Sequence, residues 1–116
     1  MLSRGMQLPH LTFLTVAGDR IVYRDFWQHH SVAIVCVADG TAAQPFIDAA
    51  AEFDRQDAIC IVTRESHGAL PCPGIVVADR WGEIARTGEA VPPVEDVLAW
   101  IEHLAHRCPE CEGEVR

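Results

Sequence analysis

The sequence has no apolar run long enough to span a membrane and no concentration of positive charge. Its longest uninterrupted apolar run, Val32 to Ala38, is far shorter than the roughly 20 residues that cross a bilayer. The first residues contain no apolar core of the kind that a secretory signal carries. The nine Lys and Arg residues form no basic run and the net charge is −8, so phosphate backbones and anionic membranes are repelled. We therefore expect a cytoplasmic protein with no nucleic-acid or membrane partner.

The sequence also lacks internal repeats, low-complexity segments and a glycine-rich phosphate loop. With 116 residues, 49% hydrophobic content and 22% charge, it is typical of one globular domain with a continuous core. The five cysteines are an odd number, which argues against a disulfide framework, and the cytosol keeps thiols mostly reduced. We expect a domain over residues 1–107 and a C-terminal tail over 108–116 that contains a Cys-x-x-Cys pair.

Two apolar segments without alternation, Val32–Val37 and Ala58–Val62, have the pattern of strands covered on both faces. Between them, apolar residues recur at helical spacing, which predicts a helix from Pro45 to Phe53 and a parallel crossover. The other segments predict an N-terminal β-hairpin (11–23), a second hairpin (74–86) and a final helix (92–107). This order predicts an α/β fold with a central mixed β-sheet flanked by helices.

The segment Cys72–Ile84 combines a proline, an apolar strand, an Asp-Arg-x-Gly turn and a return strand. Together with the order of elements, it resembles the thioredoxin-like fold. More narrowly it resembles the redoxin branch, the peroxiredoxins of the alkyl hydroperoxide reductase and thiol-specific antioxidant type. Leu8–Trp27 is similar to the opening hairpin of that group, and the resemblance extends to about Leu104. It implies that Pro73 is a cis-proline facing the helix that begins at Pro45, whereas the residues alone leave an ordinary trans proline equally open.

The loop before the first long helix contains no thiol. In a thioredoxin the Cys-x-x-Cys positions would fall on Thr41 and Gln44, and no cysteine matches a peroxiredoxin pattern there either. A threonine hydroxyl does not ionise near neutral pH and cannot replace a thiolate nucleophile. The activity that the resemblance implies therefore does not carry over to this loop.

Cys72 is the cysteine best placed to have taken over the thiol chemistry. The resemblance puts it beside the first long helix, where the helix dipole would lower the pKa of its thiol. Arg64 and His67 could add positive charge or a general base, and Thr41 completes the candidate catalytic set. The alternative is a half-buried thiol that only fills space beside Pro73. Cys36 and Cys60 lie in the apolar strands, where we expect them to act as small hydrophobes.

The tail offers a second candidate site. Cys108 and Cys111 have the spacing of one zinc knuckle, and His103 and His106 could supply the other two ligands that zinc requires. A more relaxed arrangement has two chains each donating both cysteines, which would make a homodimer. The pair could instead cycle as a disulfide, or remain as two reduced thiols.

Two functions fit these observations. The first is a divergent redoxin whose thiol–disulfide chemistry uses Cys72, or Cys108 with Cys111. The second is a non-catalytic thioredoxin-like module that holds an extended peptide or a protein partner and uses its tail as a metal clip. The missing loop cysteine favours the second, and the Cys-x-x-Cys pair favours the first.

Overall fold

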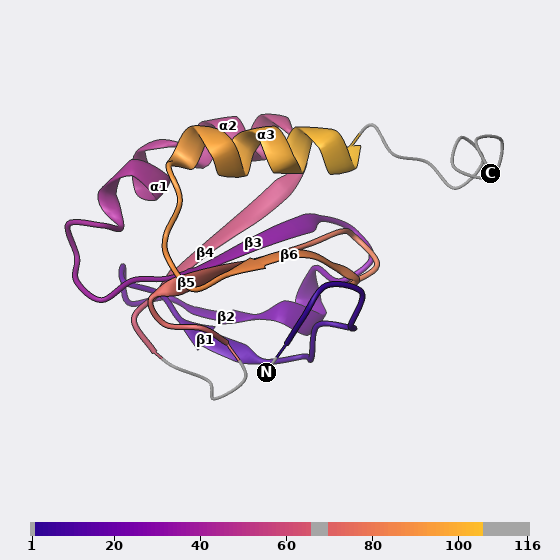
Figure 1. Cartoon of the computed structure of the whole chain (residues 1–116), viewed down its shortest axis with the longest axis horizontal. Coiled ribbons are helices and arrows are strands. Elements are labelled where there is room, and N and C mark those ends of the chain that lie inside the picture. The colour runs from indigo at the N-terminus through magenta and orange to yellow at the C-terminus, as the bar shows by residue number, and fades with distance from the viewer. Residues whose placement is uncertain (1, 66–69, 106–116) are drawn as a thin grey trace, which may run out of the picture.

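The computed structural model describes residues 2–65 and 70–105, and its elements follow the predicted order (Figure 1). No helix within these residues is long and apolar enough to cross a membrane. The elements are β1 (Thr12–Leu14), β2 (Arg20–Val22), the 3-10 turn η1 (Tyr23–Asp25), β3 (Ser31–Cys36), α1 (Gln44–Asp48), α2 (Ala50–Arg55), β4 (Ala58–Thr63), β5 (Gly74–Ala78), β6 (Ile84–Gly88) and α3 (Val94–Ala105).

The central sheet is mixed and has the strand order β4-β3-β5-β6. β3 and β4 are parallel, with Ser31 opposite Ala58, because α1 and α2 provide the crossover between them. β5 is antiparallel to both β3 and β6, and a short turn joins β5 directly to β6. β1 and β2 form a separate antiparallel hairpin. The predicted α/β class, mixed sheet and N-terminal hairpin are therefore confirmed.

The sheet is covered on both faces, which explains the unbroken apolar run of β3. Figure 1 shows α1, α2 and α3 on one face and the β1–β2 hairpin on the other. Ala33 and Val35 pack with the helices, together with Phe46 and Phe53. The alternate residues of β3, Val32 and Ile34, face the hairpin, because successive side chains of a strand point to opposite faces of the sheet. That second core contains Phe13, Tyr23, Val32, Ile34 and Val76.

The helix between β3 and β4 differs from its prediction. One helix was expected over Pro45–Phe53, but α1 and α2 are separated at Ala49. Ala49 has a ψ of 8°, far from the helical value of about −42°. The hydrogen bond from its N–H to the Pro45 carbonyl persists at 3.2 Å, so the interruption is local. Pro45 is the second residue of α1 rather than the first.

The structure shows why the turn between β5 and β6 has the sequence Asp-Arg-x-Gly. Oδ1 of Asp79 accepts hydrogen bonds from the N–H groups of Trp81 at 2.9 Å and Glu83 at 3.0 Å. Gly82 has a φ of +85°, a conformation that glycine adopts without steric cost. A Cβ at this position would also collide with the Gln7 side chain. The motif therefore closes the hairpin and leaves room for the N-terminal arm.

Tyr23, the only tyrosine in the chain, provides an optical test of the second core. Its side chain is fully buried, and burial and the nearby Asp79 carboxylate raise the pKa of its phenol to about 12. We expect the Tyr23 phenolate of native protein to form at a pH about two units higher than that of the urea-unfolded chain, in which tyrosine has a pKa near 10. Because the unfolded chain releases this proton first, stability should fall as pH rises from about 10 to 12.

Ultraviolet absorbance of the phenolate measures both titrations directly. Tyr23→Phe is the control, because it abolishes the signal and should remove the Tyr23 share of the alkaline loss of stability, leaving the share of the buried Cys60 thiol. A native tyrosine that titrates near pH 10 while the fold is intact by circular dichroism would contradict this placement.

Candidate functional site

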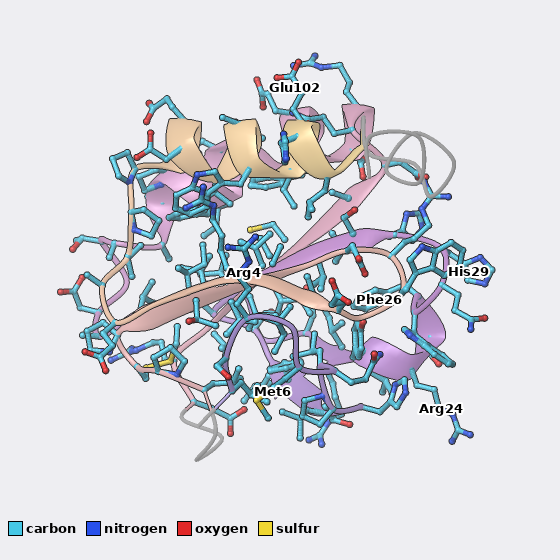
Figure 2. All side chains as sticks on the ribbon, turned by 45° about the vertical axis from the view of Figure 1, so that its right-hand side comes forward. Arg4, Met6, Arg24, Phe26, His29 and Glu102 are labelled. Carbon is cyan, nitrogen blue, oxygen red and sulfur yellow. A yellow bond between two sulfur atoms is a disulfide. The ribbon has the colours of Figure 1, made fainter. Side chains whose placement is uncertain are left out.

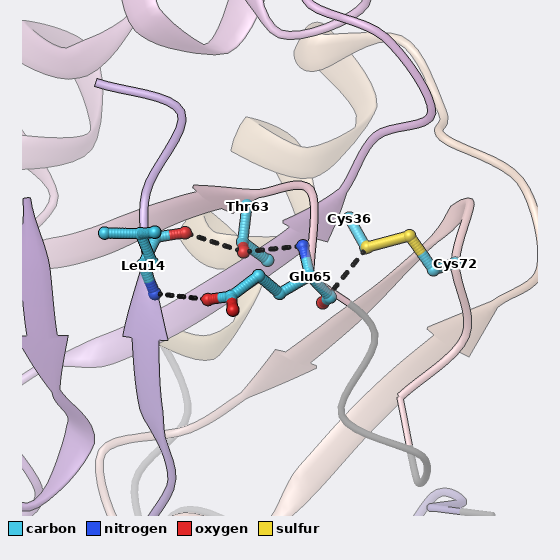
Figure 3. Close-up of a disulfide and its surroundings, with 5 residues drawn as sticks. All are labelled: Leu14, Cys36, Thr63, Glu65 and Cys72. Carbon is cyan, nitrogen blue, oxygen red and sulfur yellow. Dashed lines mark hydrogen bonds between the residues drawn. A yellow bond between two sulfur atoms is a disulfide. The ribbon is translucent and has the colours of Figure 1, made fainter. Parts of the chain in front are cut away.

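A disulfide joins Cys36 and Cys72 at one end of the central sheet (Figure 3). Cys36 is the last residue of β3, and Cys72 lies in the segment that leads into β5. The antiparallel pairing places Cys36 opposite Gly74, only two residues from Cys72. The two Cα atoms are 5.1 Å apart, within the usual range for a disulfide. The register of β3 and β5 therefore brings the two cysteines together.

The two cysteines differ in exposure. Cys36 is 1% exposed, whereas Cys72 is at the surface. The peptide bond between Cys72 and Pro73 is cis, the isomer that the resemblance implies for this proline. A molecule approaching from solvent therefore meets the Cys72 side of the disulfide.

A hydrogen-bonded group of residues surrounds the buried sulfur. Thr63, fully buried at the end of β4, donates from its hydroxyl to the Leu14 carbonyl at 2.8 Å. The same oxygen accepts the N–H of Glu65 at 3.1 Å, and a Glu65 carboxylate oxygen accepts the N–H of Leu14 at 3.1 Å. These bonds hold the Glu65 carbonyl 3.5 Å from Sγ of Cys36 (Figure 3). In the reduced protein, that carbonyl is positioned to accept the Cys36 S–H.

The expectation that Cys36 is only a small hydrophobe is wrong, although its burial is as predicted. Equally, Cys72 is half of a disulfide and not an isolated thiol. A signal for this pairing was present in the sequence. Cys36 ends one apolar strand, and Cys72 lies two residues before another. If those strands pair antiparallel, the end of the first lies beside the start of the second.

Thr41 organises the loop between β3 and α1. Its hydroxyl and N–H both donate to the Asp39 carboxylate, and the N–H of Ala42 does so at 3.3 Å. The pKa of Asp39 is lowered by these bonds, first of all by the Thr41 hydroxyl, and Arg64 contributes as a nearby positive charge. Thr41 and Arg64 therefore both interact with Asp39 at the entry to the first helix. The grouping of Thr41 and Arg64 with Cys72 in one catalytic set stays a prediction.

His67, the predicted general base, lies outside the described residues. So do His106, Cys108 and Cys111 of the predicted metal site, whose remaining member, His103, is exposed near the end of α3. Within residues 2–65 and 70–105, no group of three potential ligands could hold a metal ion. A zinc site therefore has no support in this part of the chain.

Cys60 is the free cysteine of the described residues. It lies in β4 and packs against the helix-side core. Burial raises the pKa of its thiol to about 12, so a reactive thiolate does not form near neutral pH. Its predicted role as a small hydrophobe agrees with this environment.

The fold is shared with proteins of thiol chemistry. No family model matches the chain, and no curated protein matches its sequence. The chain is similar to the mitochondrial 2-Cys peroxiredoxin of Plasmodium falciparum, with a TM-score of 0.67 and 10% identity, covering 90% of this chain and 95% of that one. It is also similar to a thioredoxin-family thiol:disulfide interchange protein of Chlorobium tepidum (TM-score 0.63, 10% identity, 90% and 99% covered). A third similar structure is the thioredoxin domain of a thiol-disulfide oxidoreductase from Bacteroides vulgatus (TM-score 0.60, 14% identity, 91% and 100% covered). The chain therefore has a thioredoxin-like redoxin fold.

Proposed function

We propose that this thioredoxin-like protein is a thiol–disulfide oxidoreductase whose redox-active pair is Cys36 and Cys72. The observation that carries the proposal is the disulfide between a buried cysteine at the end of β3 and an exposed cysteine before a cis-proline. The similar structures support the same chemistry, because two of them are described as thiol–disulfide proteins. The cysteines stand at positions other than the loop before α1, where the sequence has Thr41 and Gln44.

The difference in exposure between the two sulfurs supports a different role for each. Cys72 receives the incoming thiolate of a substrate dithiol, because Cys36 is 1% exposed. Attack on Sγ of Cys72 forms a mixed disulfide and breaks its bond to Cys36, which leaves as a thiolate. The second substrate thiolate then attacks the substrate sulfur of the mixed disulfide and releases Cys72. Two electrons pass from substrate to protein, and the two substrate protons end on Cys36 and Cys72.

The reverse reaction uses the same assignments. Reduced Cys72 attacks a substrate disulfide, and Cys36 resolves the mixed disulfide by attacking Cys72. The Glu65 carbonyl, 3.5 Å from the Cys36 sulfur, accepts the S–H between turnovers. This arrangement holds the resolving thiol beside its target at the end of β3 while keeping solvent thiols away from it.

Insulin disulfide reduction, with dithiothreitol as the electron donor, tests the proposal. We expect wild-type protein to accelerate the reaction and Cys72→Ser to abolish the acceleration, because no exposed attacking thiol remains in the pair. Cys36→Ser should lose turnover and, when mixed with insulin in the absence of dithiothreitol, should retain a mixed disulfide on Cys72, which mass spectrometry of the intact protein detects. Cys60→Ser should keep full activity, because its thiol is not available as a thiolate.

The tail cysteines are tested by the matched double variants Cys36→Ser/Cys72→Ser and Cys108→Ser/Cys111→Ser. The first should be inactive and the second active. The opposite result would assign the chemistry to the tail and refute the proposal. Wild-type protein with no activity above the dithiothreitol background would also refute it, and would favour the non-catalytic binding module.

A further inference from the structure

A cleft of about 580 Å³ lies between β6 and α3. β6 is the edge strand of the central sheet at the opposite end from β4. This volume is within the range of sites for small organic ligands. Its basic side chains come from three separate parts of the chain: Arg4 of the N-terminal arm, Arg86 of β6 and His103 of α3. Trp100 forms an aromatic wall, and Val77 and Leu104 form an apolar floor.

Within the part of the chain that the structure describes, no acidic side chain neutralises the positive charge of this cleft. The chain has a net charge of −8, yet none of the described residues that line the cleft is acidic. Neither Arg4 nor Arg86 is in an ion pair within residues 2–65 and 70–105. Figure 2 shows Arg4 beside β6 and below α3, whereas Glu102 projects from the opposite side of that helix. Two permanently charged guanidinium groups therefore share one small space, an arrangement that an anion would stabilise.

The backbone beside Arg4 and the side chain of Arg86 are held in place by other interactions. The N-terminal arm is hydrogen bonded along β6, from Gly5 N–H to the Ile84 carbonyl at 2.8 Å and from Ile84 N–H to the Met6 carbonyl at 2.9 Å. These bonds fix the residue that precedes Gly5, which is Arg4. The Arg86 guanidinium lies 4.5 Å from the centre of the Trp100 ring, a cation–π contact that limits its movement. The Arg86 guanidinium and the Arg4 backbone are therefore positioned before any ligand arrives.

We propose that this cleft binds a small organic acid, that is, a carboxylate attached to a compact apolar body. The carboxylate would bind between Arg4 and Arg86, whose planar guanidinium groups suit bidentate hydrogen bonding. The apolar body would pack against the partly exposed side chains of Trp100 and Ala85 and exclude water from them. This site is separate from the Cys36–Cys72 pair, and its ligand class does not depend on the proposed redox activity.

Nuclear magnetic resonance of the full-length, ¹⁵N-labelled protein tests the site, with benzoate as the probe. Three indole N–H signals exist, one for each tryptophan, and we expect benzoate to shift that of Trp100 saturably with a dissociation constant in the millimolar range or below. The Trp27 N–H donates to the Trp81 carbonyl at 3.0 Å, remote from the cleft, and should not shift. Arg4→Gln and Arg86→Gln should each weaken binding by about tenfold, because each removes a charge-assisted hydrogen bond.

Three controls make the result decisive. Arg24→Gln should bind benzoate as wild type does, because Arg24 lies on a distant part of the surface (Figure 2). Benzyl alcohol has the same apolar body without the charge and should bind much more weakly. Inorganic phosphate has the charge without the apolar body and should also bind more weakly. Equal binding of benzoate and either compound, unchanged affinity in both arginine variants, or no saturable shift would overturn the proposal.

Discussion

Reduction of the Cys36–Cys72 disulfide is expected to lower the free energy of unfolding by about 4 kcal/mol. The bond closes a loop with a sequence separation of 36 residues, and cross-linking such a loop removes many conformations from the unfolded chain. The enclosed segment contains α1, α2 and β4, so the constraint acts on most of the parallel crossover. Urea unfolding of wild-type protein with and without dithiothreitol measures the difference.

Substitution separates the loss of the cross-link from the chemistry of the reductant. Cys36→Ala/Cys72→Ala should unfold like reduced wild type and should no longer respond to dithiothreitol. Cys60→Ala retains the disulfide and should still respond. Equal stability of oxidised and reduced protein would mean that the native state gains nothing from this bond.

The covered strands were predictable because their sequence pattern depends on burial alone. β3 and β4 are apolar at consecutive positions, and one core on each face of the sheet accounts for this directly. The β5–β6 hairpin was predictable for a different reason. Asp79 accepts a hydrogen bond from an N–H group of the turn, and Gly82 adopts a positive φ. Because both interactions are local, the same spacing of Asp and Gly indicates a turn in any chain.

The disulfide was missed because it depends on how distant strands pair. Cys36 looks like any buried strand residue until the register of β3 and β5 places it opposite Gly74. The odd cysteine count was also misleading, since parity describes the whole chain and a single pair can form beside unpaired thiols. The break at Ala49 was equally hidden, because alanine favours a continuous helix and nothing in its neighbours opposes one.

The surroundings of the candidate catalytic residues could be predicted only in part, because they too depend on how distant segments fold together. Cys72 could be identified from its place before Pro73, where the resemblance implies an active-site position. Thr41 donates to Asp39 through a loop conformation that the local sequence pattern does not specify, so this contact could not be predicted. Its hydroxyl stabilises the entry to α1, a structural role that explains why a threonine is useful at a position without thiol chemistry.

Gly74→Ala is expected to lower the free energy of unfolding by about 3 kcal/mol, the upper end of the usual cost of overpacking. A Cβ at Gly74 would lie 2.5 Å from the Gly88 carbonyl oxygen and 2.6 Å from Cβ of Pro71. Neither neighbour is the free end of a flexible side chain. The Gly88 carbonyl belongs to β6, which pairs with β5 at the next position, and Pro71 is directly followed by Cys72. The new methyl group must therefore separate two paired strands or displace the segment that contains the exposed cysteine.

The second of these displacements connects packing to the proposed chemistry. A shift of Pro71 moves Cys72 relative to Cys36, so Gly74→Ala should also slow closure of the disulfide from the reduced protein, measured by acid quenching and thiol labelling. Gly40→Ala is the matched control, because no atom lies within 4 Å of its added Cβ and its stability should change by no more than about 0.5 kcal/mol. If Gly74→Ala matched this control in both stability and closure rate, close packing against Pro71 and Gly88 would not be what positions Cys72. The link between the β5–β6 pairing and the redox pair would then be lost.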